Sequence, residues 1–284
     1  MVVLVTGASG QLGQALKSIS QVYPRITFHF KDSAEADITN KEVLSNIFEL
    51  VKPNFTINAA AYTAVDKAES EPEKAALINV VGSKNLAEVC QEFDSVLIHI
   101  STDFVFDGSS LIPYKEDFPT NPTSVYGRTK RDGEQKIAAA MEKFFIIRTS
   151  WVYSGFGNNF MKTMLRLAAE RDELNIVSDQ IGTPTHAVDL AEAILHIITF
   201  SDTSGKNLYG IYNYSNEGKA SWFDFAAKIF ELNHVSINLN PISTSQFPTP
   251  AKRPKYSVLD KEKIKDVFQL HIEDWETSLR KHHA

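Results

Sequence analysis

The sequence predicts an α/β fold, namely a Rossmann-type doubly wound parallel sheet with a smaller C-terminal lobe. The apolar run at 2–5 ends in a glycine-rich turn, as a buried parallel strand does. Further apolar runs then alternate with helical stretches of about ten residues or more, which is typical of repeated β-α units. The alternation loosens after about residue 150, which predicts the second lobe.

The first half of the chain alternates between the two kinds of segment. Strands are expected at 2–5, 26–30, 55–58, 96–100 and 144–148. Helices are expected at 11–22, from a cap at Thr39 or Asn40 to about 51, within 73–92, and from a cap at Thr123 or Ser124 onward. Gly108 and the prolines at 113, 119 and 122 predict a loop before that last helix.

The second half is less regular. Helices are expected at 158–171, 186–200 and 221–232, a strand and turn at 176–182, an extended segment at 211–214 and a proline-rich loop at 240–255. We therefore expect a dinucleotide-binding core at 1–150. Residues 151–284 would form mainly the second lobe, with some segments, at about 158–200, returning to the core.

Composition narrows the functional classes. The net charge of −6 argues against a nucleic-acid surface, and no apolar run is long enough to span a membrane. The single cysteine, Cys90, cannot form an intrachain disulfide, and the chain enters a strand at once without a leader segment. These features predict a cytoplasmic protein. We expect no metal site, because the histidines lack ligand spacing and His282 and His283 lie in a tail expected to fray.

A glycine motif follows the first strand. Gly7, Gly10 and Gly13 form G-x-x-G-x-x-G at the mouth of a helix. Such a turn lets the backbone approach a pyrophosphate, and the helix offers unpaired N–H groups and a positive dipole end. A strand before the motif and a helix after it are the context in which it indicates dinucleotide binding. The alternative is a tight structural turn.

The end of the second strand leaves the choice of cofactor open. Asp32 lies at the distance expected of an acid that binds ribose hydroxyls, whereas Lys31 could meet a 2′-phosphate and favour NADPH. Solvation at the surface is the alternative for both. We expect NADPH, with NADH also accepted. Asp37 could reach the adenine or serve as a turn acid, and the small residues at 58–61 would let the cofactor lie against the backbone.

A hydroxyl and a Tyr-x-x-x-Lys pair form the candidate catalytic set. Tyr126 and Lys130 share one face of a helix, so the ammonium could approach the phenol and lower its pKa. The tyrosine could then exchange a proton with a carbonyl oxygen during hydride transfer. Thr102, at a strand end, would hydrogen-bond the same oxygen. Asp103 would contact substrate or fix the loop.

These motifs together resemble those of the extended short-chain dehydrogenase/reductases, and in particular of the members that reduce nucleotide-linked keto sugars. The matching segments are TGASGQLG, INAAAYTAVDKAESEPE, STDFVFDG, PTSVYGRTKRDGE, RTSWVYSGFGNNFMKTMLRLA, VSDQIGTPT and RPKYSVLD. They run over most of the chain. The resemblance implies a nucleotide-sugar substrate, NADPH or NADH as cofactor, and a homodimer in many members, some of which hold Mg²⁺ at the interface.

The resemblance also implies roles for residues at matched positions. Thr102, Tyr126 and Lys130 would be catalytic. The cofactor-binding set would be Gly7, Gly10, Gln11, Leu12, Gly13, Asp37, Ile38, Ala61, Tyr62, Thr63, Tyr126 and Lys130. The sugar would meet Thr102, Asp103, Tyr126 and Trp151, whose flat ring suits a sugar although it could also pack in the core. Further candidates are Asn158, Asn159, Gln180, Thr183 and Arg253, each with a purely structural alternative.

Two other functions fit the same motifs. A reductase or epimerase of a different nucleotide sugar would share the catalytic set and differ in the lobe. A non-catalytic regulatory subunit that binds NADP would need the glycine turn alone. The presence of both Tyr126 and Lys130 favours an enzyme.

Overall fold

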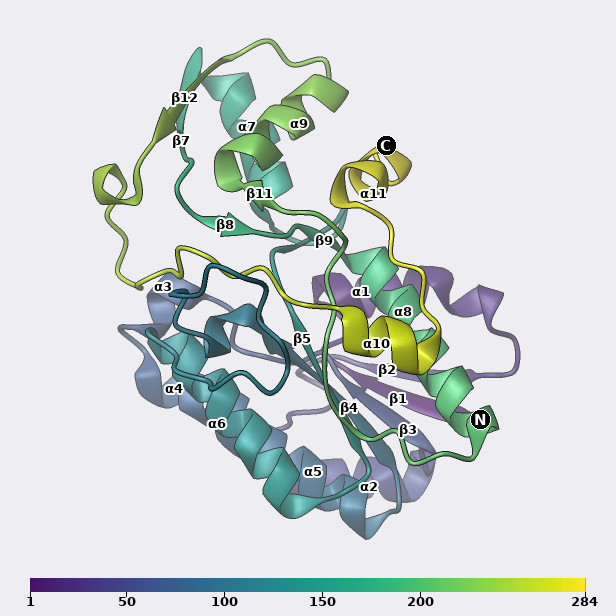
Figure 1. Ribbon diagram of the computed structural model, residues 1–284. Coiled ribbons are helices and arrows are strands. Elements are labelled where there is room, and N and C mark those ends of the chain that lie inside the picture. The colour runs from purple at the N-terminus through teal and green to yellow at the C-terminus, as the bar shows by residue number, and fades with distance from the viewer. Residues whose placement is uncertain (284) are drawn as a thin grey trace.

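The structure, a computed structural model that describes residues 1–283, is organised around a six-stranded parallel sheet (Figure 1). The strand order is β10-β5-β4-β3-β1-β2. The strands are β1 (Val2–Thr6), β2 (Thr27–Lys31), β3 (Phe55–Asn58), β4 (Val96–Thr102), β5 (Phe144–Thr149) and β10 (Gly210–Asn213). The chain passes from β1 to β2 and then returns to β3 on the other side of β1. In such sheets ligands bind outside the carboxyl ends of the strands at this reversal.

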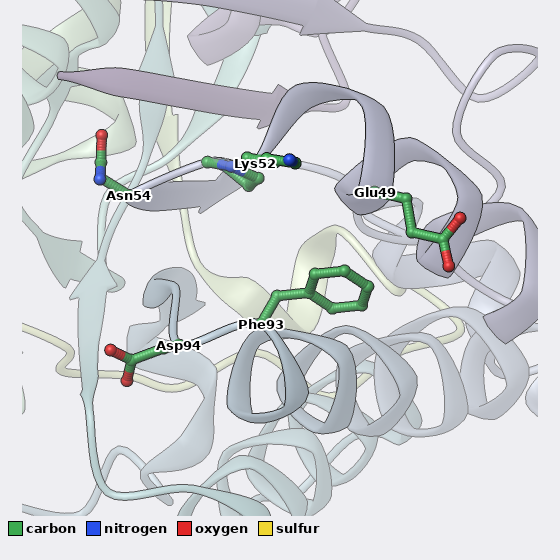
Figure 2. A pocket seen from close by; sticks show the side chains of 6 residues that line it. Glu49, Lys52, Asn54, Phe93 and Asp94 are labelled. Carbon is green, nitrogen blue, oxygen red and sulfur yellow. The ribbon is translucent and has the colours of Figure 1, made fainter.

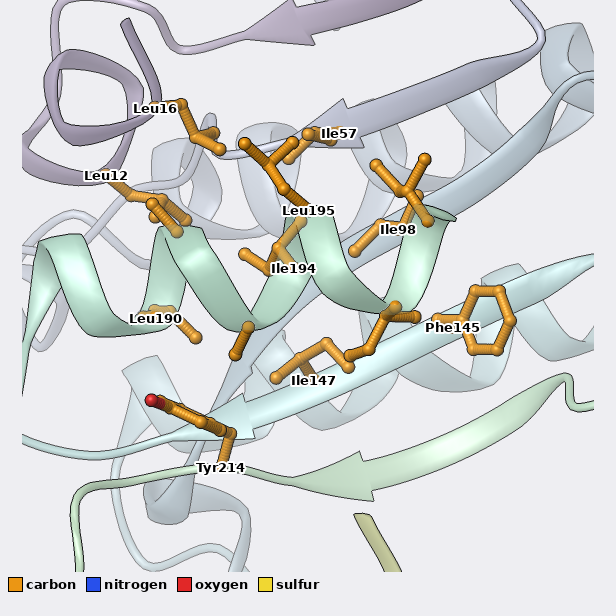
Figure 3. Packing of buried hydrophobic residues seen from close by; sticks show 14 of the residues in the cluster. Leu12, Leu16, Ile57, Ile98, Phe145, Ile147, Leu190, Ile194, Leu195 and Tyr214 are labelled. Atoms are coloured by element: carbon orange, nitrogen blue, oxygen red, sulfur yellow. The ribbon is translucent and has the colours of Figure 1, made fainter. Parts of the chain in front are cut away.

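Helices cover both faces of the sheet. One face carries α1 (Gln11–Ile19) and α8 (Ala187–Ser204), and the other carries α2 (Lys41–Val51), α5 (Ser83–Glu92) and α6 (Val125–Ala140). Successive residues of each strand point to opposite faces of the sheet, so each face has its own apolar core. Ile57, Ile98 and Ile147 pack toward α8, as Figure 3 shows, while their neighbours Leu97 and Ile146 pack toward α5 and α6. The predicted doubly wound α/β fold is confirmed.

The expected elements are present with shifted ends. The segment expected as one helix within 73–92 runs continuously through α4 (Pro72–Ala76), a π-helical stretch at Leu77–Gly82, and α5. Asn40 caps α2 and Ser124 caps α6, each accepting a hydrogen bond from a backbone N–H. The helix expected at 11–22 ends at Ile19 and is followed by a 3₁₀ turn at Ser20–Val22. Short helix α3 (Val65–Ala68) was not predicted.

The predicted loop at 240–255 is partly wrong. Its first residues belong to strand β12 (Asn238–Ile242), which pairs in parallel with β7 (Glu173–Val177). Pro241 lies inside this strand opposite Ile176. Proline lacks an N–H but is tolerated where a strand has only one neighbour, as in this two-stranded sheet. Pro241 therefore marks an edge strand, whereas Pro248, Pro250 and Pro254 lie in the loop that was predicted.

The C-terminal lobe has its own apolar core. It is formed by β6 (Val152–Tyr153), α7 (Phe160–Glu170), β7, β8 (Ile181–Gly182), β9 (Thr185–His186), β11 (Ala220–Ser221), α9 (Trp222–Leu232), β12 and α11 (Trp275–Lys281). The side chains of Tyr153, Phe225 and Trp275 lie at its centre. Helix α8, strand β10 and helix α10 (Glu262–Phe268) pack with the main sheet instead. Within 158–200, α7 thus belongs to the lobe and α8 to the core.

A polar pocket lies at the edge of the sheet formed by the amino ends of the strands. It is lined by Glu49 of α2, by Lys52 and Asn54 before β3, and by Phe93 and Asp94 before β4 (Figure 2). These residues lie at the amino ends of the strands, whereas Thr102, Tyr126 and the glycine turn lie at the carboxyl edge. The candidate site is therefore elsewhere. Within residues 1–283, no helix is both long and apolar enough to cross a membrane.

Candidate active site

The glycine turn between β1 and α1 leaves no room for side chains. Gly7 has φ +71°, and a Cβ there would lie 2.5 Å from the Ala60 nitrogen. A Cβ on Gly13 would lie 2.5 Å from the Gly7 carbonyl oxygen. The turn therefore brings α1 directly against β1, and Gly10 begins the helix without a side-chain cap. The first N–H groups of α1 thus remain available for an anion, which fits the pyrophosphate of a dinucleotide.

A pocket of about 580 Å³ adjoins this turn at the carboxyl end of β2. Its lining includes Ser9, Lys17, Phe30, Asp32 and Glu35. This is where the adenine-side ribose of a dinucleotide lies in such folds. The pocket and the glycine turn together fit a bound dinucleotide.

The two charged residues at the end of β2 that could bind the adenine ribose each have a partner within the following turn. Lys31 Nζ lies 2.9 Å from Glu35 Oε1, and Asp32 Oδ1 accepts hydrogen bonds from two N–H groups of the following turn. Asp37 Oδ1 likewise accepts from the backbone and hydroxyl of Thr39. Ile38 is buried under α5 and lies against Gly82. Asp37 thus stabilises the turn that follows β2, which is the structural alternative to a contact with adenine.

A buried asparagine organises the segment after β3. Asn79 Oδ1 accepts from the Tyr62 N–H at 2.9 Å, and Asn79 Nδ2 donates to the Tyr62 carbonyl at 3.1 Å and to Thr129 Oγ1 at 3.0 Å. These bonds tie the backbone of Ala61–Thr63 to α6. No motif pointed to Asn79, because its role depends on residues 17 and 50 positions away.

Thr102 and Tyr126 are brought together by a close contact of two backbones. A Cβ on Gly127 would lie 2.2 Å from the Phe104 carbonyl oxygen, so the start of α6 sits on the turn that follows β4. The Tyr126 ring packs edge-on against Phe104, with centroids 5.6 Å apart. Lys130 follows one turn later and is 2% exposed.

Burial dominates the ionisation of this group. It raises the pKa of Tyr126 to about 12, with help from the Asp103 charge and against a hydrogen bond from Thr102. It lowers the pKa of Lys130 to about 8, against the charge of Glu134. The expected lowering of the tyrosine pKa is therefore not seen. Lys130 Nζ donates to the Ile100 carbonyl at 2.6 Å and lies 3.2 Å from His99 Nε2, a residue that no motif singled out.

Asp103 adds a second buried acid. Thr102 Oγ1 donates to its Oδ1 at 3.0 Å, while Oδ2 has no hydrogen-bond partner within residues 1–283. Burial raises the pKa of this carboxyl to about 6, against a hydrogen bond from Thr102. An unpartnered buried oxygen beside Thr102 and Tyr126 is suited to a sugar hydroxyl.

Trp151 stacks on a second tryptophan. Its ring lies 3.5 Å from that of Trp222 with an interplanar angle of 7°, and its backbone has φ +47°. Trp222 Nε1 donates to Gln180 Oε1 at 3.2 Å. One face of the Trp151 ring is thus covered by α9, and Gly182 of β8 also lies against this ring, since a Cβ there would come within 2.6 Å of it. Only the exposed part of this half-buried pair is open to a sugar, and Trp222 carried no sequence signal.

The remaining candidates mostly join the lobe to the core. Gln11 Oε1 accepts from Ser154 Oγ and Asn159 Nδ2, each at 3.0 Å, and Asn159 also caps α7. Thr183 Oγ1 donates to the Gly218 carbonyl, and Asn158 is exposed. Arg253 forms a two-pronged ion pair with Asp66, with bonds of 2.9 and 2.6 Å.

The prediction that His282 lies in a frayed tail is wrong. His282 does not lie in a frayed tail, because its ring stacks on His186 with centroids 3.9 Å apart and its Nε2 lies 2.8 Å from Asp189 Oδ1. Ligand-type atoms of these three residues lie within 4.8 Å of one another. Parallel rings direct their nitrogens along parallel planes and not toward one point, so stacking and hydrogen bonding account for the cluster without a metal.

A glycine turn for a pyrophosphate and a Thr–Tyr–Lys group at one carboxyl edge define a Rossmann-type oxidoreductase of the extended short-chain dehydrogenase/reductase class. The family described as the RmlD substrate binding domain matches residues 1–284. A dTDP-4-dehydrorhamnose reductase of Aggregatibacter actinomycetemcomitans is 43% identical over 98% of this chain and 96% of its own length.

Two solved structures agree with that relative. A dTDP-4-dehydrorhamnose reductase from Clostridium acetobutylicum is 40% identical, with a TM-score of 0.93, over 99% of this chain and 98% of the other. One from Bacillus anthracis, in complex with NADP, is 39% identical with the same TM-score and coverage. The chain therefore belongs to the RmlD substrate binding domain family, and the resemblance inferred from its motifs is confirmed.

Proposed function

We propose that this protein reduces the C4 ketone of dTDP-4-dehydro-L-rhamnose to dTDP-L-rhamnose with NADPH or NADH. The observation that carries the proposal is the buried Thr102–Tyr126–Lys130 group beside a dinucleotide turn, in a chain whose relatives at about 40% identity bear this activity as their name. The unpartnered Asp103 oxygen and the paired tryptophans add a polar and an aromatic surface for a sugar.

The residues divide the reaction between them. The cofactor, when bound, supplies a hydride to the ketone carbon. The hydroxyl of Thr102 turns from Asp103 Oδ1 to the substrate, donates a hydrogen bond to the ketone oxygen and stabilises the negative charge that develops there. Tyr126 gives its phenolic proton to that oxygen, so that the ketone becomes an alcohol. The raised pKa of Tyr126, about 12, keeps this proton in place until it is needed.

The cofactor would be held along the switch between β1 and β3. The N–H groups of Gln11 and Leu12 would bind the pyrophosphate beside Gly10, whose own N–H donates to the Gly7 carbonyl at 3.0 Å. Gly7 and Gly13 would keep that path free of side chains. Asp37 and Ile38 would flank the adenine. The backbone of Ala61–Thr63, fixed by Asn79, and Lys130 would line the nicotinamide half.

The first experiment follows nicotinamide absorbance. Purified protein is mixed with NADPH or NADH and with the keto sugar, generated in place from dTDP-glucose by the enzymes that precede this step. We expect oxidation that depends on the sugar, and a loss of kcat of about 10²–10⁴-fold in Tyr126→Phe with cofactor binding unchanged. The matched control is Tyr23→Phe, which lies outside the site and should keep full activity.

The outcomes separate the alternatives. Absence of oxidation with either cofactor, from protein that still binds both, would reject the reductase and favour the regulatory function. Oxidation with other keto sugars but not with this one would move the assignment to a different nucleotide sugar. Full activity in Tyr126→Phe would remove the tyrosine from the mechanism.

We also propose that the protein acts in the cytoplasm as a homodimer that binds no nucleic acid. The acidic net charge of −6 disfavours nucleic acid. Leu77 and Val81, one helical turn apart in the run from α4 to α5, are 46% and 42% exposed and offer an apolar face to a second copy. Light scattering should give twice the chain mass of 31.8 kDa, and a single chain mass would reject the dimer.

A further inference from the structure

A row of buried polar side chains crosses the sheet and ends at Lys130. Thr6, Asn58 and His99 occupy facing positions on β1, β3 and β4, and all three are at most 1% exposed. Thr6 Oγ1 donates to Asn58 Oδ1 at 2.9 Å, Asn58 Nδ2 lies 3.0 Å from His99 Nδ1, and His99 Nε2 lies 3.2 Å from Lys130 Nζ. The proposed reaction leaves Thr6, Asn58 and His99 without a role.

The direction of these hydrogen bonds can be fixed from one end. The Ala60 backbone N–H donates to Asn58 Oδ1 at 3.2 Å, and a backbone N–H can only donate. The oxygen of the Asn58 amide therefore faces Ala60 and Thr6, and its NH₂ group faces His99. His99 Nδ1 must accept from that NH₂ group. A neutral imidazole carries one proton, so the proton of His99 lies on Nε2.

The orientation of His99 determines which form of Lys130 it favours. An N–H on Nε2 needs an acceptor, and the atom that it faces is Lys130 Nζ. An uncharged amine has a lone pair and can accept, whereas an ammonium group has three donors and no acceptor. The uncharged amine can also still donate to the Ile100 carbonyl. The charged form would need His99 and Asn58 both to reverse, which would turn the Asn58 NH₂ toward the Ala60 N–H.

The other charged groups around Lys130 fit this arrangement. On its own helix, Glu134 favours the charged form of Lys130, but both Glu134 oxygens are bound by Arg148 of β5 at 3.0 and 2.7 Å. Tyr126, also on α6, keeps its proton because burial raises its pKa to about 12. From β4, burial holds the pKa of His99 well below 6.5, so the ring stays neutral.

We propose that His99, oriented by Asn58, is a positioning residue that favours the uncharged amine of Lys130 and so lets this lysine gain and lose a proton near neutral pH. The inference rests on the proposed function for its kinetic meaning. Reduction of a ketone takes up one proton per turnover, which Tyr126 gives away and must recover in a buried site. A lysine with an ordinary pKa of about 10.4 would stay charged, whereas one that titrates near neutrality can carry that proton.

The tautomer of His99 can be measured without any activity. In protein labelled with ¹⁵N-histidine, the ring signals that disappear in His99→Asn identify His99. We expect Nε2 to be protonated and Nδ1 unprotonated at about pH 9, where Lys130 is uncharged. The ring should not become an imidazolium down to about pH 5.5, because the pKa of His99 lies well below its ordinary value. A proton on Nδ1 at about pH 9, or titration of this ring near pH 6.5, would overturn the inference whether or not the protein reduces the keto sugar.

The kinetic test follows the ionisation of Lys130. The pH dependence of kcat should contain an ionisation near pH 8 that is absent from Lys130→Met. In His99→Asn the amide keeps its contact with Asn58 but no longer reaches Nζ, so this ionisation should move upward by on the order of one pH unit. His196→Asn is the matched control, since the His196 Nε2 contact is with the Phe268 carbonyl, away from α6.

A second variant, Asn58→Asp, changes the tautomer of His99 and keeps the proposal testable if His99→Asn does not fold. In Asn58→Asp a carboxylate would accept from Nδ1–H, so Nε2 would lose its proton and accept from a charged Lys130. The same upward shift is expected, together with a Nδ1–H signal. An ionisation that stays near pH 8 in both variants would reject the role of His99.

Discussion

At the scale of residues, we expect single charges at the end of β2 to determine whether the adjoining pocket accepts a phosphate at the 2′ position of the adenine ribose. Lys31 could attract a 2′-phosphate, yet it is paired with Glu35 at 2.9 Å, and Asp32 adds a second negative charge to the same pocket. This explains why the sequence alone favours neither cofactor strongly. The balance depends on which partner Lys31 takes, which is a property of the folded turn.

Removing the competing acid should therefore shift the cofactor preference. In Glu35→Gln, Lys31 is free to bind a 2′-phosphate, and one charge-assisted hydrogen bond is worth about 1.5 kcal/mol or more. We expect the ratio of kcat/KM for NADPH to that for NADH to rise about tenfold. Glu42→Gln, on the exposed start of α2, is the control and should leave the ratio unchanged. An unchanged ratio in Glu35→Gln would mean that Lys31 does not face the phosphate.

The proximity of residues could be predicted from the sequence where their spacing lies within about one turn. Tyr126 and Lys130 are one helical turn apart, and Gly7, Gly10 and Gly13 occupy one turn, so local sequence suffices to place them. Asn79, His99 and Trp222 could not be predicted, because only the fold brings their partners close to them. Their bonds to Tyr62, Lys130 and Gln180 span between 17 and 42 positions.

At the scale of elements, the start of α8 depends on a cluster of ionisable groups. His186 caps the helix through Nδ1, which accepts from the Val188 N–H. Burial lowers the pKa of His186 to about 4, with the His282 and Lys281 charges acting the same way and Asp189 opposing them. Asp189 is held in the charged form by hydrogen bonds from His282, Ser278 and Asn216, which keep its pKa well below the ordinary value despite burial. The cluster joins α8 to α11.

This cluster should make the fold sensitive to acid. The folded pKa of His186 lies below its unfolded value of 6.5, so protonation favours unfolding. Its stabilising contribution is complete above pH 6.5 and is lost as the pH falls toward 4, by on the order of 2 kcal/mol. Urea unfolding at pH 7 and pH 5 should show a smaller loss in His186→Asn, since asparagine can still cap a helix. His271→Asn is the control because His271 is 86% exposed.

Equal losses of stability in His186→Asn and in the unaltered protein would reject this account.

The histidine cluster also shows why elements near chain ends are hard to predict. Helix α11 has only seven residues and no long apolar period, and its position depends on Trp275 and Leu279 packing into the lobe. Short helices of this kind are stabilised by tertiary packing more than by their own sequence.

At the scale of the whole molecule, the site lies where the lobe and the core are tied together. Gln11, next to the glycine turn, binds Ser154 and Asn159 of the lobe, and Arg253 of the C-terminal segment binds Asp66 of α3. The alternation of strands and helices was enough to predict the core and its dinucleotide edge. The ties could not be predicted, because each joins residues more than 140 positions apart.

The Asp66–Arg253 pair should therefore control how the lobe presents the sugar side of the site. Arg253 holds the pKa of Asp66 below its usual value, and the Ala251 N–H donates to the same carboxylate. In Asp66→Asn the two-pronged bond is lost, and we expect KM for the nucleotide sugar to rise about three- to tenfold while KM for NADPH stays the same. Because both side chains are partly exposed, the free energy of unfolding should fall by only about 1 kcal/mol or less.

A matched variant separates this effect from the loss of any ion pair. Asp94 also forms a 2.6 Å ion pair, with Lys143, but it lies at the amino edge of the sheet in the pocket of Figure 2. Asp94→Asn should change neither KM. If Asp66→Asn raised both KM values equally, or left both unchanged, the segment around Arg253 would have no particular role on the sugar side. A selective rise for the sugar would mean that the C-terminal segment, though far along the chain from Tyr126, forms part of the substrate-binding machinery.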